Sequence, residues 1–144
     1  MKHINALAVS LAAVGAWLGL LIGPVDGLLI TLIIFAVVDY VTGVVAAIVN
    51  KKLSSAVGFK GIAKKVLIFA IVIIANLIDT YVLGGNSVLR TAVIFFYLSN
   101  EGISILENAG EIGLPIPRKL KNILAQLRNK SEEDKDDGDQ NIQS

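Results

Sequence analysis

The sequence predicts an all-α integral membrane protein with four transmembrane helices. Hydrophobic residues make up 54% of the 144-residue chain and charged residues 17%, whereas about a quarter of a soluble domain is usually charged. The charges are also clustered, because only Asp26 and Asp39 are charged between Lys2 and Lys51. In addition, four long apolar runs are separated by short polar segments. This distribution is typical of a membrane protein built as one unit.

The composition excludes several kinds of functional site. The chain has no cysteine and a single histidine, His3, so disulfides, thiolate metal sites and histidine metal clusters are ruled out. It contains no glycine-rich phosphate loop, no HExxH motif and no serine with a partner histidine. We therefore predict no catalytic residue, no metal and no cofactor. The net charge of +1 gives no indication of nucleic-acid binding.

The first apolar run covers residues 4–23 and contains no charge. At about 1.5 Å per residue it spans about 30 Å, the thickness of the hydrocarbon core of a bilayer. A cleaved signal peptide is the alternative, with Lys2 and His3 as its basic start, although the run exceeds the usual apolar region of about 7–15 residues. Residues 23–27 then predict a turn in which Asp26 caps the next helix.

The second and third apolar runs flank a predicted polar loop. Residues 28–49 form the second span, with one charge, Asp39, near its middle. Residues 50–65 are predicted to form the loop, which carries five lysines. Residues 66–83 form the third span, with Asp79 close to its end. Because backbone polar groups in lipid must be satisfied within the segment, each span is predicted to be helical.

The fourth run is the most polar of the four. Two glycines, an asparagine and a serine at 84–87 predict a tight turn before it. Residues 88–106 then form the fourth predicted span, although they include Arg90, Asn100 and Glu101.

The C-terminal part is predicted to lie outside the transmembrane domain of residues 1–112. Prolines 115 and 117 interrupt the chain at the start of a second region, 113–130. Residues 118–130 of this region predict a short basic amphipathic helix. Its apolar face comprises Leu120, Ile123, Leu124 and Leu127. Residues 131–144 contain one apolar residue and predict a disordered acidic tail.

Lysine and arginine predict the orientation in the membrane. Short loops rich in these residues stay cytoplasmic, so the 50–65 loop and the 113–130 region are predicted inside. The turns at 23–27 and 84–87 contain neither residue and are predicted outside. Four crossings with both termini cytoplasmic satisfy these constraints, whereas three would require one segment to lie on the surface or be removed. For the loop lysines, contact with anionic lipid is favoured over nucleic-acid binding.

Ionisable side chains within the spans need partners, protonation or water, because an ionised aspartate at mid-bilayer costs about 2.5–3.5 kcal/mol. Asp79 and Arg90 flank the same turn, and we predict a salt bridge between them that either holds the hairpin together or takes part in gating. Asp39 lies alone at mid-span. We interpret it either as a protonated carboxyl bonded to a neighbouring helix or as a group that meets water once subunits assemble.

Two stripes of residues are candidates for contacts within the membrane. On the fourth span, polar residues at spacings of 7, 4, 3, 4 and 3 share one helical face, which should contact helices or water and not lipid. They are Arg90, Tyr97, Glu101, Ser104, Asn108 and Glu111. A dry packing seam and a pore lining both fit this face. Small residues that allow close helix packing are Gly15, Gly19, Gly23 and Gly43. The first three repeat every four residues and predict self-association through the first helix.

Five segments of the chain form a recognisable set. They are GPVDGLL (23–29), DYVTG (39–43), KKLSSAVGFKGIAKK (51–65), LRTAVIFFYLSNEGISILENAG (89–110) and GLPIPRKLKNILAQL (113–127). In this order and spacing, they resemble the phage lysis and toxin-secretion holin family, which includes prophage holins of Gram-positive bacteria and the holin-like protein of clostridial toxin loci.

The resemblance implies a pore-forming homo-oligomer in the cytoplasmic membrane of the bacterial host. Such proteins accumulate in the lipid bilayer and open lesions at a set time, so that an endolysin, or a large toxin, escapes without needing direct contact. The family has no catalytic motif that would transfer to residues of this chain.

Two other functions are compatible with the residues. A small ion channel or proton-coupled transporter would use Asp39 and Asp79, although four short helices without a repeat leave little room for alternating access. A non-conducting scaffold would recruit a cytoplasmic partner through the basic loop and the basic C-terminal region.

Overall fold

Four long α-helices account for most of the protein. The computed structural model describes residues 2–123, 125 and 126. The helices are α1 (Lys2–Ile22), α2 (Gly27–Val49), α3 (Ser55–Tyr81) and α4 (Val88–Glu111). No strand occurs among the described residues, so the prediction of an all-α fold is confirmed.

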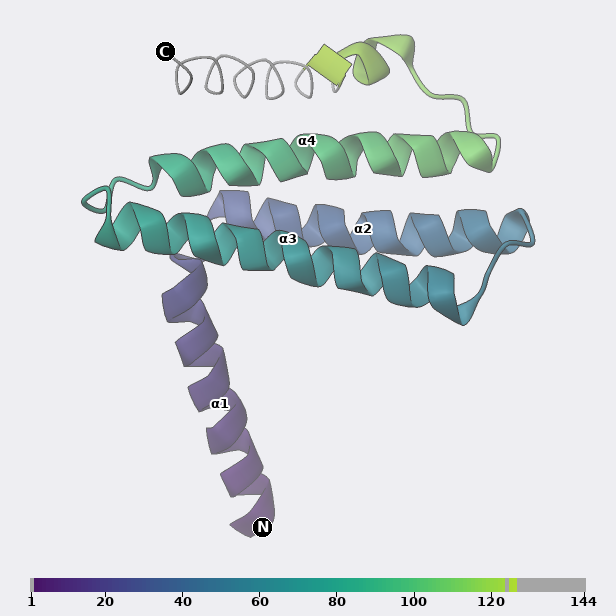
Figure 1. The fold of residues 1–144 in the computed structure, drawn as a ribbon. Helices are drawn as coiled ribbons and strands as arrows, with labels where there is room; N and C mark the ends of the chain where they lie inside the picture. The colour runs from purple at the N-terminus through teal and green to yellow at the C-terminus, as the bar shows by residue number, and fades with distance from the viewer. Residues whose placement is uncertain (1, 124, 127–144) are drawn as a thin grey trace.

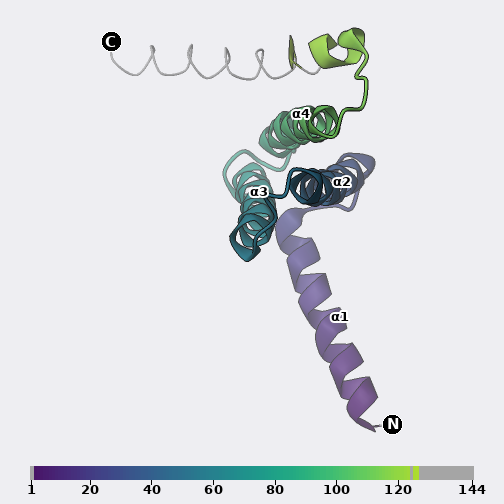
Figure 2. The ribbon, with the colours of Figure 1, turned by 90° about the vertical axis from the view of Figure 1, so that its right-hand side faces the viewer.

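Three of the helices form a bundle, and the first leaves it. Helices α2, α3 and α4 run side by side (Figure 1), and the view along them shows α4 lying against both others (Figure 2). Helix α1 contacts α3 near its C-terminal end and then points away from the bundle in both views. The ion pairs of Lys65 with Asp39 and Glu101 therefore lie between α2, α3 and α4.

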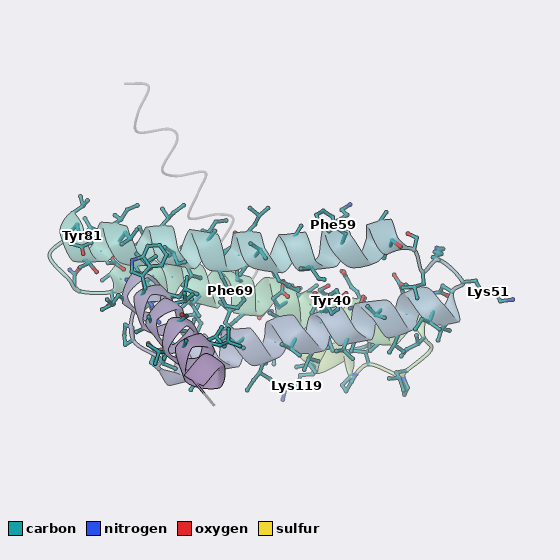
Figure 3. All side chains as sticks on the ribbon, turned by 90° about the horizontal axis from the view of Figure 1, so that it is seen from below. Tyr40, Lys51, Phe59, Phe69, Tyr81 and Lys119 are labelled. Atoms are coloured by element: carbon teal, nitrogen blue, oxygen red, sulfur yellow. The ribbon has the colours of Figure 1, made fainter. Side chains whose placement is uncertain are left out.

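Two helices meet the length and hydropathy expected of a membrane span. These are α2, with 23 residues, and α3, with 27, which correspond to about 34 and 40 Å. Helix α1 is apolar over the shorter range 6–22. Many large apolar side chains on the bundle surface are exposed, for example Phe59 and Tyr81 on the outside of α3 (Figure 3). Such a surface is expected to be covered by lipid.

The start of α2 follows from its capping residue. The Asp26 carboxylate accepts the backbone N–H of Leu29 at 2.9 Å, which confirms the predicted cap. An oxygen at this position satisfies one of the unpaired N–H groups in the first helical turn.

The start of α3 differs from the prediction. Ser54 caps this helix by accepting the N–H of Val57 at 3.2 Å, and the helix begins at Ser55. The predicted loop over 50–65 is therefore wrong, because the connection comprises only residues 50–54. Lysine favours helix almost as well as leucine, so the lysines from Lys60 onward extend the helix and do not end it.

The first turn of α4 is capped from the neighbouring helix. Ser87 precedes this helix with a left-handed backbone and makes no side-chain cap. The buried Asp79 carboxylate of α3 accepts the N–H groups of Leu89 at 3.0 Å and Arg90 at 2.7 Å instead. At its other end, α4 continues to Glu111, five residues beyond the predicted span. An anion at a helix N-terminus is stabilised by the helix dipole, so Asp79 joins α3 to α4.

The bundle is layered along its length. We call the end that carries the 50–54 loop the lysine end; Lys51 projects outward there (Figure 3). We call the opposite end, which carries residues 23–26 and the 82–87 turn, the linker end. Between polar groups at the two ends lies an apolar layer, in which every side chain is at most 2% exposed. It comprises Leu32, Ile68, Val72 and Ile94.

The C-terminal region is only partly described. Residues 118–123, 125 and 126 are helical and lie beside the end of α4 (Figure 1). The rest of the predicted helix over 118–130, and the predicted acidic tail over 131–144, fall outside the described residues. A groove of about 510 Å³ between α4 and this segment is lined by aliphatic side chains, including Ile103, Leu106 and Ile116, and by charged ones.

Gly23 gives a test of the linker end. Its φ is +87°, and an added Cβ would lie 2.9 Å from Cγ of Asn76 and 3.0 Å from Nε of Arg90. A left-handed non-glycine residue costs about 1–3 kcal/mol. We expect Gly23→Ala to lower the free energy of unfolding by at least this amount, measured by helical circular dichroism in detergent.

The matched control is Gly27→Ala, because Gly27 is helical and no atom lies within 4 Å of its added Cβ. Alanine there should leave stability unchanged or raise it by up to about 1 kcal/mol. Equal losses in both variants would contradict the close approach at Gly23.

Candidate functional site

A buried charged cluster joins the three helices of the bundle. Lys65 of α3 donates to the carboxylates of Asp39 from α2 and Glu101 from α4. The three side chains are 13%, 10% and 0% exposed, respectively. Charges at this depth need paired and hydrogen-bonded partners, so each helix of the bundle supplies one member of the cluster.

Asn108 extends the cluster toward the lysine end. Its amide Nδ2 lies 3.1 Å from Oδ1 and 3.2 Å from the backbone carbonyl of Asp39, and 3.0 Å from the hydroxyl of Thr42. About one turn further on, the Asn50 amide donates to Glu111 at 3.4 Å. A line of polar contacts between α2 and α4 therefore reaches the end of the bundle. We call this line the polar seam; it comprises Asp39, Thr42, Asn50, Lys65, Glu101, Asn108 and Glu111.

The charges of the cluster do not balance within its buried part. Two carboxylates share Lys65, and a second lysine, Lys64, lies 3.9 Å from Oε1 of Glu101 with its side chain 56% exposed. Among the described residues, no donor makes a hydrogen bond to that oxygen. With all three buried groups ionised, Asp39, Lys65 and Glu101 carry a net charge of −1, which is costly to bury.

A second polar cluster holds the linker end. The buried Arg90 guanidinium donates to the carbonyl oxygens of Ile22 at 3.0 Å and Pro24 at 2.7 Å. It also forms an ion pair with Asp26 at 2.8 Å, and Asn76 donates to the carbonyl of Leu21 at 2.9 Å. The last carbonyl groups of a helix lack hydrogen-bond donors within that helix. Here, side chains of α3 and α4 donate to the last carbonyl groups of α1.

The predicted salt bridge between Asp79 and Arg90 is wrong in its chemical detail. The two residues are in contact, but Asp79 accepts the backbone N–H of Arg90, while the guanidinium pairs with Asp26. The linker between α1 and α2 folds over the start of α4 and brings a second carboxylate to Arg90. This contact joins the linker to the α3–α4 hairpin.

Asp26 is expected to make stability depend on pH in acid. The hydrogen bond from the Leu29 backbone, and next the Arg90 side chain, hold the pKa of Asp26 below its ordinary value of 3.8. A group with a lowered folded-state pKa contributes stability that is present above its unfolded pKa and lost as pH falls through the folded pKa.

We therefore expect the wild-type melting temperature to fall as pH drops below about 3.8. Asp26→Asn can still cap α2 but carries no charge, so its melting temperature should be lower at neutral pH and change less in acid. Identical pH profiles for the two proteins would contradict an ion pair with Arg90.

The other predicted site residues occupy different surroundings. Tyr97 packs against the apolar layer and makes an edge-to-face contact with Phe96, at 5.1 Å between ring centroids. Ser104 is half-buried on α4 between Glu101 and Asn108. Tyr97, a member of the predicted polar stripe, therefore packs against the apolar layer.

The small residues also divide into two groups. Gly43 lies against Asn108, with 3.5 Å between its added Cβ and Nδ2, and Gly23 lies against Asn76 and Arg90. Gly15 and Gly19 have no atom within 4 Å of an added Cβ, because this part of α1 lies outside the bundle.

Lys65 is the member of the charged cluster that the sequence does not indicate. The composition of residues 50–65 predicts a polar loop for Lys65, whereas it lies one turn before Ile68 on the buried face of α3. The spacing of 65, 68, 72, 76 and 79 follows a single helical face and carries the signal that could have placed it. For the same reason, the interpretation of Asp39 as a lone carboxyl at mid-span is wrong, because Asp39 pairs with Lys65.

The site offers no metal centre of the usual kind. In the part of the chain that the structure describes, no group of three or more His, Cys, Asp or Glu side chains could hold a metal ion. The Lys65 ammonium already occupies the space between the two buried carboxylates.

Comparison with known proteins relates the chain to bacteriophage holins. The sequence profile of the bacteriophage holin family matches residues 16–129. A probable holin of Bacillus phage phi105 is 37% identical over 109 residues, which cover 76% of this chain and 80% of that protein.

Two bacterial proteins are similar over almost their whole length. An uncharacterised 14.9 kDa protein of Clostridium perfringens is 42% identical over 130 residues, covering 90% of this chain and 96% of that protein. An uncharacterised protein of Listeria monocytogenes is 47% identical over 128 residues, covering 89% and 91%. No solved structure matches the chain.

Proposed function

Because this chain belongs to the bacteriophage holin family, we propose that it accumulates in the cytoplasmic membrane of a bacterium and opens lesions there. An endolysin, or a large toxin, then leaves the cell through these lesions. The chain is a membrane protein with two helices that could cross a bilayer by length and composition. The observation that carries the proposal is a polar seam built inside such an apolar bundle.

We propose four crossings, with both termini in the cytoplasm. Helices α2 and α3 are joined at the lysine end, where Lys51, Lys52 and Lys60 are exposed. Lysine-rich ends stay on the cytoplasmic side. At the linker end, Arg90 is buried and paired, so it does not oppose this orientation. The α3–α4 turn then faces outward, and α1 forms the fourth crossing once it aligns with the bundle.

We propose that the lesion is lined by the polar seam of many subunits. Within one subunit, Asp39 and Glu101 both pair with Lys65 in the interior of the bundle, so a dispersed subunit presents mainly apolar side chains to lipid. When subunits associate, their seams can open toward a shared water-filled space, where ionised groups regain hydration. High subunit concentration favours this exchange by mass action.

The test of this function is expression in a bacterium with and without a cytoplasmic endolysin. With endolysin, we expect abrupt lysis after a delay, and without it, loss of viability and release of cytoplasmic protein. Leakage of ions alone would favour a channel, and unchanged viability with normal membrane potential would favour a scaffold. Either outcome would contradict the proposed function.

Orientation can be tested separately because the natural chain has no cysteine. Single cysteines at Ser54 and Asn86 lie at opposite ends of the bundle. We expect a membrane-impermeant thiol reagent added to intact cells to label Asn86→Cys and not Ser54→Cys. The reverse pattern would contradict the proposed orientation without contradicting lesion formation.

A further inference from the structure

Glu101 lies at the inner end of the polar seam. Its side chain is 0% exposed. Oε2 accepts from Lys65, while Oε1 lacks a hydrogen-bond donor among the described residues. A buried carboxylate oxygen without a donor is costly, so this oxygen is a position where a proton would be retained.

The seam connects Glu101 to the lysine end. Contacts run from Glu101 through Lys65 to Asp39, and then through Asn108 to Thr42. Beside this line, the ammonium of Lys64 is 3.9 Å from Glu101, and its side chain is more than half exposed. Polar groups with exchangeable protons therefore lie between Glu101 and the surface at this end.

In the opposite direction, Glu101 meets the apolar layer. Leu32, Ile68, Val72 and Ile94 fill the interior between the charged cluster and the linker end, and each is at most 2% exposed. Polar groups resume beyond this layer at Arg90 and Asp79, which are held by their own partners. A proton entering from the linker end would have to cross side chains that cannot bind it.

We propose that Asp39, Lys65 and Glu101 form a proton-binding site that is open to the lysine end of the bundle only. The charged groups facing Glu101 are Asp39 from α2 and Lys64 and Lys65 from α3; on α4 itself, Tyr97 is the nearest titratable side chain, one turn away. In the reaction, hydronium transfers one proton to the carboxylate, giving a neutral carboxylic acid and water. The bound proton removes the net charge of −1 from the buried cluster.

The site has a consequence for regulation. A protonated Glu101 attracts the Lys65 ammonium less strongly than the carboxylate does, so the contact between α3 and α4 weakens when the pH at the lysine end falls. Cytoplasmic pH would then set how readily subunits open their seams. This consequence rests on the proposed function and orientation, whereas the proton binding does not.

The experiment is infrared difference spectroscopy on the full chain reconstituted in liposomes with one orientation, which protease access to the C-terminal region establishes. The pH is changed between about 8 and 5, above the usual titration of exposed carboxyls, on one side at a time. We expect a carboxylic-acid carbonyl band when the lysine end is acidified and none when the linker end is acidified. Glu101→Gln should remove the band, and Glu107→Gln, an exposed position on the same helix, should not.

The proposal is overturned if the band is absent at both ends, appears equally from both ends, or persists in Glu101→Gln. Should that variant fail to insert, Glu101→Asp keeps the carboxyl, and its band should have a shifted midpoint. If the pH midpoint of the band were unshifted in Glu101→Asp, the proton would be bound by a group other than residue 101. Lysis takes no part in the readout, so failure here is distinguishable from failure of the proposed function.

Discussion

Glu101→Leu is expected to leave membrane insertion intact and to delay lysis several-fold or abolish it. Removing Glu101 leaves Lys65 paired with Asp39, so the dispersed subunit keeps a neutral ion pair and should remain folded. In an open lesion the effect differs, because a hydrated carboxylate is replaced by leucine. On insertion scales the two side chains differ by about 3 kcal/mol per subunit, in the direction that disfavours contact with water.

The measurement is lysis time at equal protein level in the membrane, with endolysin supplied. The matched control is Glu107→Leu, which makes the same change on an exposed face of α4. We expect the control to lyse at nearly the normal time. Unchanged lysis timing in Glu101→Leu would count against the polar seam as the lining of the lesion.

Lys65→Met is expected to destabilise the subunit itself. This change leaves Asp39 and Glu101 facing each other without the cation that both contact. Removing one partner from a buried charge pair typically costs about 3–5 kcal/mol. We expect less protein to accumulate in the membrane, and a correspondingly lower free energy of unfolding in detergent.

Two further variants make this prediction specific. Lys60→Met changes an exposed lysine of the same helix and should have little effect on unfolding. The double variant Lys65→Met with Glu101→Leu removes one of the unpaired carboxylates and leaves Asp39 with Asn108. It should be more stable than Lys65→Met alone. A double variant that is less stable than Lys65→Met would contradict the conclusion that Lys65 stabilises both carboxylates.

Much of the architecture follows from the apolar runs and from the turn and capping residues between them. Runs of about 20 apolar residues must be helical in lipid, and the Asp26 cap could be read directly from the turn before α2. Composition does not indicate the boundary at Ser54, because a segment rich in lysine resembles a loop, whereas helix formation depends on periodicity and capping. Placing that boundary correctly puts Lys65 on the buried face of α3.

The partners of the buried charges depend on tertiary structure. The stripe of polar residues on α4 predicted a face that contacts other helices, and Glu101, Asn108 and Glu111 do contact α2 or α3. Sequence could not show that Arg90 pairs with Asp26, because two carboxylates are near it and the fold of the linker decides between them. Whether the seam also faces water depends on other subunits.

The accessibility of Ser104 to water tests the central claim most directly. Ser104→Cys places a single thiol on the face of α4 that carries Glu101 and Asn108, and Phe95→Cys places one on an exposed apolar face. Thiols react as thiolates in contact with water. We predict that an impermeant thiol reagent modifies Ser104→Cys only at the onset of lysis and leaves Phe95→Cys unmodified. Protection of Ser104→Cys throughout lysis would contradict a lesion lined by the polar seam.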